Sequence, residues 1–313
     1  MNYILNKIRE HNIIIIHRHN RPDGDCMGSQ LGLKDIIINS FKDKKVYVVG
    51  DEEEEFFYLG RMDHIDDEIY EKALVFVLDV ANTDRISDLR YQKGKELIKI
   101  DHHPFVTKYC DYEWIDTSYA SCCEMITDFF RQNKHCLKLS NEGAKALLYG
   151  MITDTNRFIT PVVNKRTFEL VTLLLDYSIN LNEVYQHIYD ENINITRLRG
   201  YVAENFTCTT NGLGYIKLNK TTCDKYHVNA SISNTLVNTL SNTSSVKAYF
   251  VAIYDDRTDK IRISLRSKGI PINGIAEKYG GGGHVYSSGM MLDNMELVDD
   301  VVKDLDLLLE NYK

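Results

Sequence analysis

The first half of the chain alternates short, unbroken apolar runs with longer segments in which apolar residues recur at helical spacing. The apolar runs are rich in β-branched residues, end in polar turns and cover residues 13–16, 46–49, 74–78 and 97–100. Such runs are typical of strands buried on both faces of a parallel sheet. Helical spacing is present over residues 29–39, 139–149 and 167–176. The pattern predicts an α/β domain with a mostly parallel sheet flanked by helices.

The second half of the chain differs in composition and in its apolar pattern. From about residue 192 Thr, Asn and Ser become frequent, and strand-like runs occupy residues 213–218, 246–254 and 260–266. This change indicates a second, smaller domain of the α+β class. We therefore predict a first domain over residues 1–184, a helical linker over residues 185–205 and a second domain over residues 206–313.

Composition fits a two-domain globular protein. The chain has 313 residues, of which 43% are hydrophobic and 26% charged. No window reaches the roughly 18 uninterrupted apolar residues of a membrane span, and charges interrupt the N-terminal segment where a signal peptide would be apolar. The seven cysteines are an odd number without C-x-x-C spacing, which favours reduced thiols. We expect a cytoplasmic protein without membrane contact.

The net charge limits the kind of nucleic acid that the chain can bind. A formal charge of −8 argues against a broad basic surface for long strands or duplexes. A small or short anionic substrate is compatible with this charge.

Polar clusters follow three of the predicted strands at their carboxyl ends. His19, Asp23 and Asp25 follow the first run, Asp79 ends the third, and His102 and His103 come just after the fourth. In open α/β sheets this edge is where ligands bind. Imidazoles and carboxylates converging there predict a site for divalent metal ions such as Mn²⁺, Mg²⁺ or Zn²⁺.

The first cluster also has a purely structural interpretation. Asp25 could cap a helix that begins near Met27, and the cluster would then be an ordinary polar loop. Capping does not explain why similar residues follow two further strands.

Asp154 adds a fourth carboxylate. It follows an apolar helical segment, where burial without a partner would be costly. Four aspartates and the histidines suffice to share two ions roughly 3.5 to 4 Å apart. We expect two divalent ions, Mn²⁺ with Mg²⁺ as the alternative, bridged by Asp79, whose loss should remove metal and turnover.

The segments HNRPDGD, VLDVANTDR, DHH and the later TD together resemble the four motifs of the DHH phosphoesterase superfamily. The segments RISLRSKG and IAEKYGGGGHVYSSG resemble the DHH-associated domain, DHHA1, of many members. The resemblance covers nearly the whole chain and implies a catalytic DHH domain facing a DHHA1 domain across a cleft.

The resemblance also implies roles for individual residues. The implied metal ligands are His19, Asp23, Asp25, Asp79, His102 and Asp154. His103 is expected to face the scissile phosphate, although the sequence leaves open which of the two adjacent histidines ligates metal. Arg18 and His17 are placed on the substrate side or behind the ligands, and a hydrogen bond within the sheet edge is the alternative for His17.

The second domain carries candidates for phosphate binding. Gly281, Gly282 and Gly283, followed by His284, would let backbone N–H groups approach a phosphate closely, although a flexible turn is the alternative. Alternation places Arg262, Ser264 and Arg266 on one face of a strand, and arginines bind phosphates bidentately. We expect metals on one wall of the cleft and a phosphate clamp on the other.

Among DHH phosphoesterases, a chain with only these two domains resembles the nanoRNase and pAp phosphatase branch. The implied activity is hydrolysis of short oligoribonucleotides, from the 3′ end or from both ends, and of 3′-phosphoadenosine 5′-phosphate (pAp) to AMP. The alternatives are a stand-alone phosphodiesterase for cyclic di-AMP or pApA and a catalytically silent nucleotide sensor. The expected partners are short RNA or small nucleotides, with a homodimer among the expected states.

Overall fold

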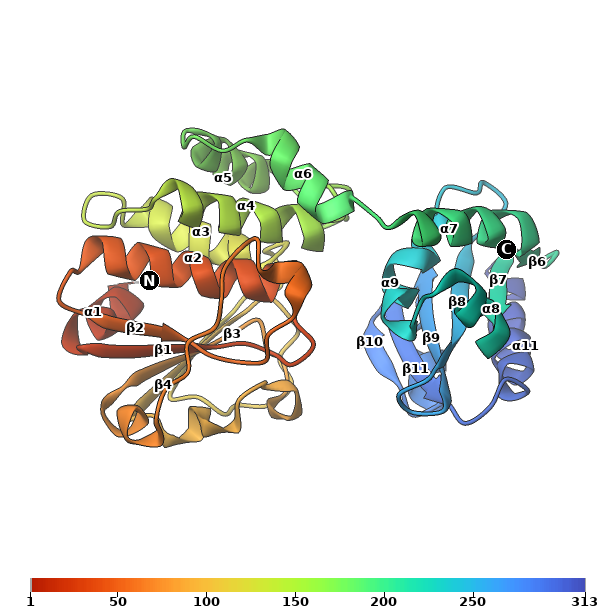
Figure 1. The fold of residues 1–313 in the computed structure, drawn as a ribbon, viewed down its shortest axis with the longest axis horizontal. Coiled ribbons are helices and arrows are strands. Elements are labelled where there is room, and N and C mark those ends of the chain that lie inside the picture. Colours follow the sequence, from red (N-terminus) through yellow and green to blue (C-terminus); the bar gives the residue numbers. More distant parts are fainter. Residues whose placement is uncertain (1, 313) are drawn as a thin grey trace. The chain divides into compact units, whose positions relative to one another are not determined.

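The chain divides into two units between Asp190 and Glu191 in the computed structural model, which describes residues 2–312 (Figure 1). The predicted linker segment contains the end of helix α6 (Leu181–Tyr189) and all of helix α7 (Ile193–Asn205). Each unit has its own sheet and its own hydrophobic core. The predicted cleft concerns the placement of one domain against the other and stays a prediction.

Unit 1 is built on five parallel strands in the order β2-β1-β3-β4-β5. The strands are β1 (Ile13–His17), β2 (Lys45–Val48), β3 (Leu74–Leu78), β4 (Glu96–Asp101) and β5 (Tyr112–Ile115). The four apolar runs are the first four strands, so the predicted α/β fold with a parallel sheet is confirmed. All residues of β3 are buried, as expected for a central strand covered on both faces.

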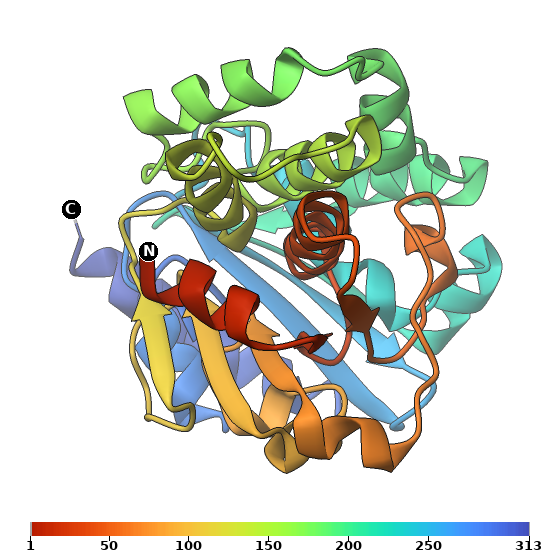
Figure 2. The ribbon, with the colours of Figure 1, turned by 90° about the vertical axis from the view of Figure 1, so that its left-hand side faces the viewer.

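Helices cover one face of this sheet, as both ribbon views show (Figures 1 and 2). They are α1 (Asn2–Glu10), α2 (Gly24–Ser40), α3 (Cys122–Gln132) and α4 (Asn141–Asp154), with α5 (Lys165–Leu175) and α6 packed on α3 and α4. Ile14 and Ile16 of β1 point into the core on this side, because alternate residues of a strand face opposite ways. Ile15 belongs to a second cluster on the other face, with Tyr70 and Tyr91 from the 3₁₀ helices Asp67–Lys72 and Leu89–Lys93.

Helices α2 and α4 pack unusually closely because glycines line their contact. A Cβ at Gly28 would lie 2.4 Å from the carbonyl oxygen of Ala146. A Cβ at Gly150 would lie 2.2 Å from Cys123 Sγ and 2.9 Å from the carbonyl oxygen of Gly24. Such distances exclude any side chain without movement of a helix. The close approach brings the end of α4 beside the start of α2.

Unit 2 contains a six-stranded sheet in the order β10-β11-β9-β8-β7-β6. The strands are β6 (Thr207–Cys208), β7 (Leu213–Leu218), β8 (Ala248–Asp255), β9 (Lys260–Ser267), β10 (Gly282–His284) and β11 (Ser287–Leu292). Only the β7–β8 pair is parallel. The helices are α7, α8 (Lys220–Tyr226), α9 (Ser233–Leu236), α10 (Asn273–Lys278) and α11 (Leu297–Glu310). This mixed sheet with helices agrees with the predicted α+β class.

The sequence predicted neither a membrane span nor disulfides. Within residues 2–312, no helix is both long and apolar enough to cross a membrane. All seven cysteines lie in this part of the chain, and none of them forms a disulfide.

Candidate metal centre

The predicted ligands gather at the carboxyl edge of the first sheet. His19, Asp23 and Asp25 lie where β1 leads into α2, and Asp79 directly follows β3. His102 follows β4. Asp154 is the last residue of α4, which the close helix packing brings to the same place. Three strand ends and one helix end therefore supply the cluster.

The cluster has two halves that share Asp79. In the first half, His19 Nε2 lies 3.4 Å from Asp23 Oδ2 and 3.6 Å from Asp79 Oδ2. In the second half, His102 Nε2 lies 3.4 Å from Asp79 Oδ1, 3.5 Å from Asp154 Oδ2 and 3.8 Å from Asp25 Oδ2. His103 Nδ1 also lies 3.5 Å from Asp79 Oδ1, so one oxygen of Asp79 faces His19 and the other faces His102 and His103.

These separations fit ligands of a common cation better than hydrogen bonds. A hydrogen bond to a carboxylate oxygen is normally shorter than about 3.2 Å. Two ligands bound at roughly 2.1 Å to a tetrahedral ion lie about 3.4 Å apart. Asp79 Oδ1 is also buried and has no hydrogen-bond partner among residues 2–312. The donor set therefore fits divalent metal ions.

The cluster has a buried floor and an open rim. Asp25, Asp79 and His19 are 1%, 2% and 3% exposed. The side chains of Asp23 and Asp154 are 57% and 33% exposed. The partial exposure of Asp154 means that its burial costs less than its sequence context indicated. A substrate could approach the cluster from the side of Asp23 and Asp154.

Helix N-termini hold two of the carboxylates in place. Asp23, not Asp25, is the N-cap of α2, which begins at Gly24, and its Oδ1 accepts from the backbone N–H of Asp25 and of Cys26. The interpretation of Asp25 as a cap is therefore wrong. The carboxylate of Asp25 instead accepts from the first N–H groups of α3, those of Cys122 at 2.6 Å and Cys123 at 2.8 Å.

Asp79 adopts a left-handed backbone conformation with φ of +59°. Its N–H still donates to the carbonyl of Ile100, so the strand pairing continues while the side chain turns toward the cluster. Left-handed residues other than glycine cost energy and concentrate at functional sites. Aspartate tolerates this conformation better than most residues.

Burial and neighbouring charges set the protonation of the cluster. Burial alone would raise the pKa of Asp79, but interactions with His102 and His19 outweigh it and hold this pKa well below the usual range. The pKa of Asp25 is raised, mainly by burial and then by the charges of Asp79 and Asp154. Its two backbone hydrogen bonds act in the opposite direction, because they favour the ionised form. Burial raises the pKa of Asp154 to about 6, against the opposing effect of His102. Asp79 is thus held in its ionised form by the neighbouring imidazoles, whereas burial favours the protonated forms of Asp25 and Asp154.

His103 belongs to a buried chain of charged groups. Its Nδ1 lies 2.8 Å from Asp101 Oδ1, and the other oxygen of Asp101 lies 3.1 Å from Lys99 Nζ. Lys99 and Asp101 are both fully buried. Burial would lower the pKa of His103, but the contact with Asp101 outweighs it and raises this pKa. Sequence analysis did not identify Lys99, because a lysine inside an apolar run gives no indication of its partner.

The basic residues upstream of the cluster point elsewhere. Arg18 is fully buried, and its guanidinium donates to the backbone carbonyls of His19 and Asp51. It therefore holds the His19 loop in place. His17 is fully buried beside the rings of Tyr70 and Tyr91, on the face of the sheet opposite the helices.

The phosphate-binding candidates all lie in unit 2. Arg262, Ser264 and Arg266 share one face of β9, opposite Ile253, Val251 and Tyr249 of β8. Ser264 is 2% exposed, and its Oγ bonds to Ser233 and Asn234 of α9. Arg266 donates to the backbone carbonyl of Leu265.

The glycine-rich segment is a strand and not a loose turn. Gly282, Gly283 and His284 form the edge strand β10 and pair with β11. A Cβ at Gly281 would lie 2.2 Å from the carbonyl oxygen of Gly289, and Gly283 has φ of +137°. Glycines are needed here for the hairpin itself, while Gly283 and His284 are exposed.

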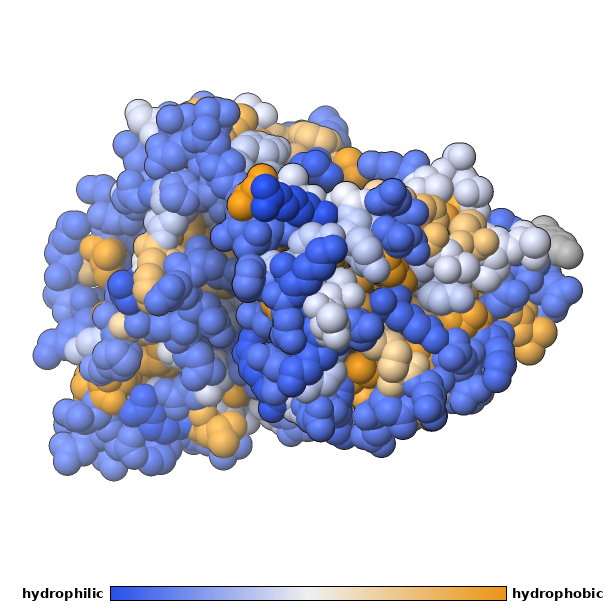
Figure 3. All heavy atoms as spheres, turned by 45° about the vertical axis from the view of Figure 1, so that its right-hand side comes forward, coloured by the Kyte–Doolittle hydropathy of each residue, from blue (hydrophilic) through white to orange (hydrophobic). Residues whose placement is uncertain are grey.

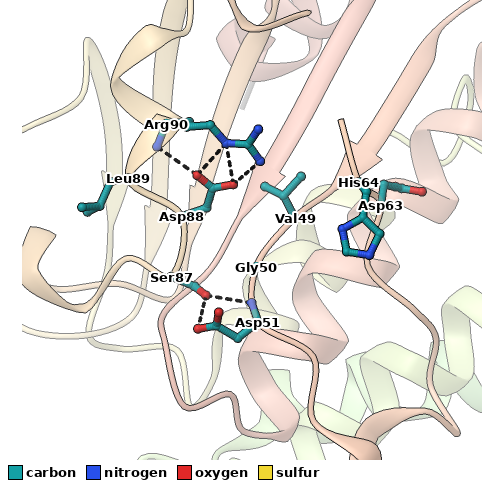
Figure 4. Close-up of a pocket in the computed structure, with 9 residues that line it drawn as sticks. All are labelled: Val49, Gly50, Asp51, Asp63, His64, Ser87, Asp88, Leu89 and Arg90. Atoms are coloured by element: carbon teal, nitrogen blue, oxygen red, sulfur yellow. Dashed lines mark hydrogen bonds and ion pairs between the residues drawn. The ribbon is translucent and has the colours of Figure 1, made fainter. Parts of the chain in front are cut away.

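A polar pocket of about 250 Å³ lies elsewhere in unit 1 (Figure 4). Its lining residues are Val49, Gly50, Asp51, Asp63, His64, Ser87, Asp88, Leu89 and Arg90. None of the predicted ligands is among them. Its charges are already paired, since Arg90 binds Asp88 and Ser87 Oγ donates to Asp51 (Figure 4). We therefore place the functional site at the cluster and not in this pocket.

Cys26 joins the first half of the cluster. One donor atom from each of His19, Asp23 and Cys26 lies within 4.8 Å of the others, and Cys26 is fully buried. Burial raises the pKa of its thiol to about 11. The signal that sequence analysis missed is a cysteine three residues after Asp23, within the motif that carries the ligands.

Comparisons with known proteins cover both units. Residues 13–151 match the family described as DHH family, N-terminal domain, and residues 215–311 match the DHHA1 domain. The Bacillus subtilis protein named "Bifunctional oligoribonuclease and PAP phosphatase NrnA" is 37% identical over 311 residues, which cover 99% of each chain. A Mycoplasma genitalium protein of the same name is 33% identical over 308 residues, 96% of this chain and 95% of the other.

A solved structure shows the same fold. The exopolyphosphatase-related protein from Bacteroides fragilis matches with a TM-score of 0.87 at 25% identity. The match covers 99% of this chain and 95% of the other. The likeness in fold thus extends over nearly the whole chain.

Proposed function

This chain belongs to the DHH phosphoesterase family and carries a DHHA1 domain, and from this premise we propose that it hydrolyses short oligoribonucleotides and converts pAp to AMP. The family predicted from the motifs is thereby confirmed. The observation that carries the proposed activity is the full set of imidazoles and carboxylates around Asp79, in a chain similar throughout to a bifunctional oligoribonuclease and PAP phosphatase.

The proposal includes two divalent ions, Mn²⁺ with Mg²⁺ as the alternative. His19, Asp23 and Asp79 would hold one ion, and Asp25, Asp79, His102 and Asp154 the other. Oxygen-rich donor sets suit these ions. When bound, a pair of such ions activates water at neutral pH and neutralises charge on the phosphoryl oxygens.

His103 acts on the substrate in this proposal. Asp101 orients its ring through Nδ1 and favours the protonated imidazole. A protonated imidazole can stabilise charge on a phosphoryl oxygen or give a proton to the leaving oxygen, which is worth about 10²- to 10⁴-fold in rate.

Unit 2 supplies phosphate contacts in this proposal. Arg262, Arg266 and the exposed end of β10 at Gly283 and His284 are the groups we assign to substrate. Ser264 and Arg18 are engaged in hydrogen bonds inside their own units, which supports a positioning role for both.

A substrate panel tests the activity. Purified protein with Mn²⁺ is incubated separately with di- to pentaribonucleotides, pAp, pApA, cyclic di-AMP and a long RNA duplex. We expect hydrolysis of the short RNAs and of pAp, and none of the duplex. Faster hydrolysis of cyclic di-AMP or pApA than of these would favour the phosphodiesterase alternative. Binding without hydrolysis of any compound would favour the sensor.

The proposal also covers location and assembly. Seven unpaired cysteines support a reducing, cytoplasmic compartment. Whether the chain forms the expected homodimer is measured by analytical ultracentrifugation.

A further inference from the structure

Cys26 completes the capping box at the start of α2, and its sulfur also lies against the first half of the cluster. Its thiol bonds to the backbone of its own turn: Sγ accepts from Asp23 N–H at 3.3 Å and donates to the Asp23 carbonyl at 3.4 Å. A thiol is a weak partner in both roles. The side chain is fully buried beside His19 and Asp23.

The neighbours of this sulfur are themselves predicted ligands. The donor atoms of His19 and Asp23 lie within 4.8 Å of Cys26 Sγ and of each other. The same imidazole faces the buried carboxylate of Asp79 at 3.6 Å, which is not a hydrogen bond. His19 Nδ1 bonds the carbonyl of Asn20, which leaves Nε2 directed at the cluster. Three different donor types therefore converge on the point that His19 faces.

Without a cation the thiol of Cys26 stays protonated, because burial raises its pKa to about 11. Cys26 is the third residue of α2, where the helix dipole offsets part of the cost of a negative charge. A bound cation removes the proton of a coordinating thiol outright.

We propose that Cys26 Sγ is a ligand of the ion held by His19, Asp23 and Asp79, and that it biases this position toward thiophilic divalent ions over Mg²⁺. The inference rests on the proposed metal binding but goes beyond the family's oxygen and imidazole ligands. On binding, the thiol releases its proton to solvent and sulfur takes the place of an oxygen donor. Thiolates favour ions such as Zn²⁺ and Co²⁺, whereas Mg²⁺ prefers oxygen. The second half of the cluster keeps only oxygen and imidazole donors.

Cobalt spectroscopy on the full-length protein tests this ligand. Metal-free protein is titrated with Co²⁺, and a thiolate ligand produces a charge-transfer band in the near ultraviolet. We expect the band in the wild type, its loss in Cys26→Ser and its retention in Cys110→Ser. Cys110 is a matched control, because it is also buried but lies on the opposite face of the sheet.

Affinity gives a second readout. Cys26→Ser should weaken Co²⁺ or Zn²⁺ binding at one of two positions by about tenfold or more, while Mg²⁺ binding changes less. Circular dichroism checks that the variant is folded. If it is not, X-ray absorption of the zinc-loaded wild type still decides, since a sulfur ligand lies at about 2.3 Å from zinc.

The proposal is overturned if wild-type protein binds cobalt without the band, if the band survives in Cys26→Ser, or if zinc has no sulfur neighbour. Hydrolysis of a diribonucleotide is measured in the same preparations. A band without hydrolysis would refute the proposed function and leave the thiolate ligand standing. Hydrolysis without a band would refute the thiolate ligand and leave the proposed function standing.

Discussion

Asp79 is the residue on which both halves of the cluster depend. One of its oxygens faces His19 and the other faces His102. Asp79→Ala should therefore remove metal from both positions and abolish turnover, because each remaining half has too few donors. Metal content by mass spectrometry and hydrolysis of a diribonucleotide check this. The exposed Asp43→Ala should change neither, and two bound ions with a normal rate in Asp79→Ala would refute the bridge.

His103 should affect the reaction without affecting the metals. His103→Ala is expected to lower kcat by about 10²- to 10⁴-fold, because a general acid or charge-stabilising group is lost. Asp101→Asn should lower kcat less, since the ring remains but loses its charged partner. Both variants should keep the metal content of the wild type. Loss of metal from His103→Ala would make this histidine a ligand instead.

Lys99 forms a fully buried ion pair with Asp101. Lys99→Met should lower the free energy of unfolding by about 3 kcal/mol, because it leaves the buried Oδ2 of Asp101 without its charged partner while His103 still bonds Oδ1. Lys95→Met, on the exposed segment before β4, should change stability by less than about 0.5 kcal/mol. Urea unfolding of both variants, with metal bound, measures the difference. Equal midpoints would show that the pair contributes nothing net.

At the scale of elements, the strands that consist of long apolar runs could be predicted from the sequence. Strands β1 to β4 of unit 1 and strands β7, β8 and β9 of unit 2 lie within one or two residues of their predicted limits. β5 was missed because its sequence YEWI is half-buried at the sheet edge and has no apolar run. β10 was missed because glycine has low strand propensity, and only pairing with β11 makes it a strand.

The candidate site was predictable only in part, because some of its contacts depend on tertiary packing and not on local sequence. Residues at strand ends could be expected to meet, because parallel strands share one carboxyl edge. Local sequence does not reveal that α3 would hold Asp25, that Cys26 would face His19 or that Lys99 would reach Asp101. Those contacts depend on how helices pack and which way a loop turns.

The close packing of α2 and α4 provides a prediction at this scale. Gly150→Val should push the helices apart, because even a Cβ would lie 2.2 Å from Cys123 Sγ. Overpacking of this kind costs about 1 to 3 kcal/mol, and metal affinity should fall because Asp154 moves away from Asp25. Gly200→Ala in α7 has nothing within 4 Å of the new Cβ and should stabilise the protein by about 0.5 to 1 kcal/mol. Calorimetry and metal titration measure both, and unchanged metal affinity in Gly150→Val would contradict the argument.

On the scale of the whole molecule, the predicted roles divide between the two units. Every candidate ligand lies before Asp190 and every candidate arginine of the phosphate clamp lies after Glu191. The surface seen in Figure 3 is mainly hydrophilic, and the net charge of −8 leaves little general attraction for polyanions. Substrate affinity should therefore depend on a few specific phosphate contacts and not on the overall field.

Variants of β9 test this division. Arg262→Ala should raise KM for a diribonucleotide by about 10- to 100-fold, the scale of one lost charge-assisted hydrogen bond of roughly 1.5 to 3 kcal/mol. Metal content and kcat should change much less, because the ligands are in the other unit. Lys260→Ala is the matched control, since Lys260 lies on the same strand and the same face and its ammonium pairs with Asp293. A fall in kcat with unchanged KM, or an equal effect of Lys260→Ala, would contradict a phosphate contact at Arg262.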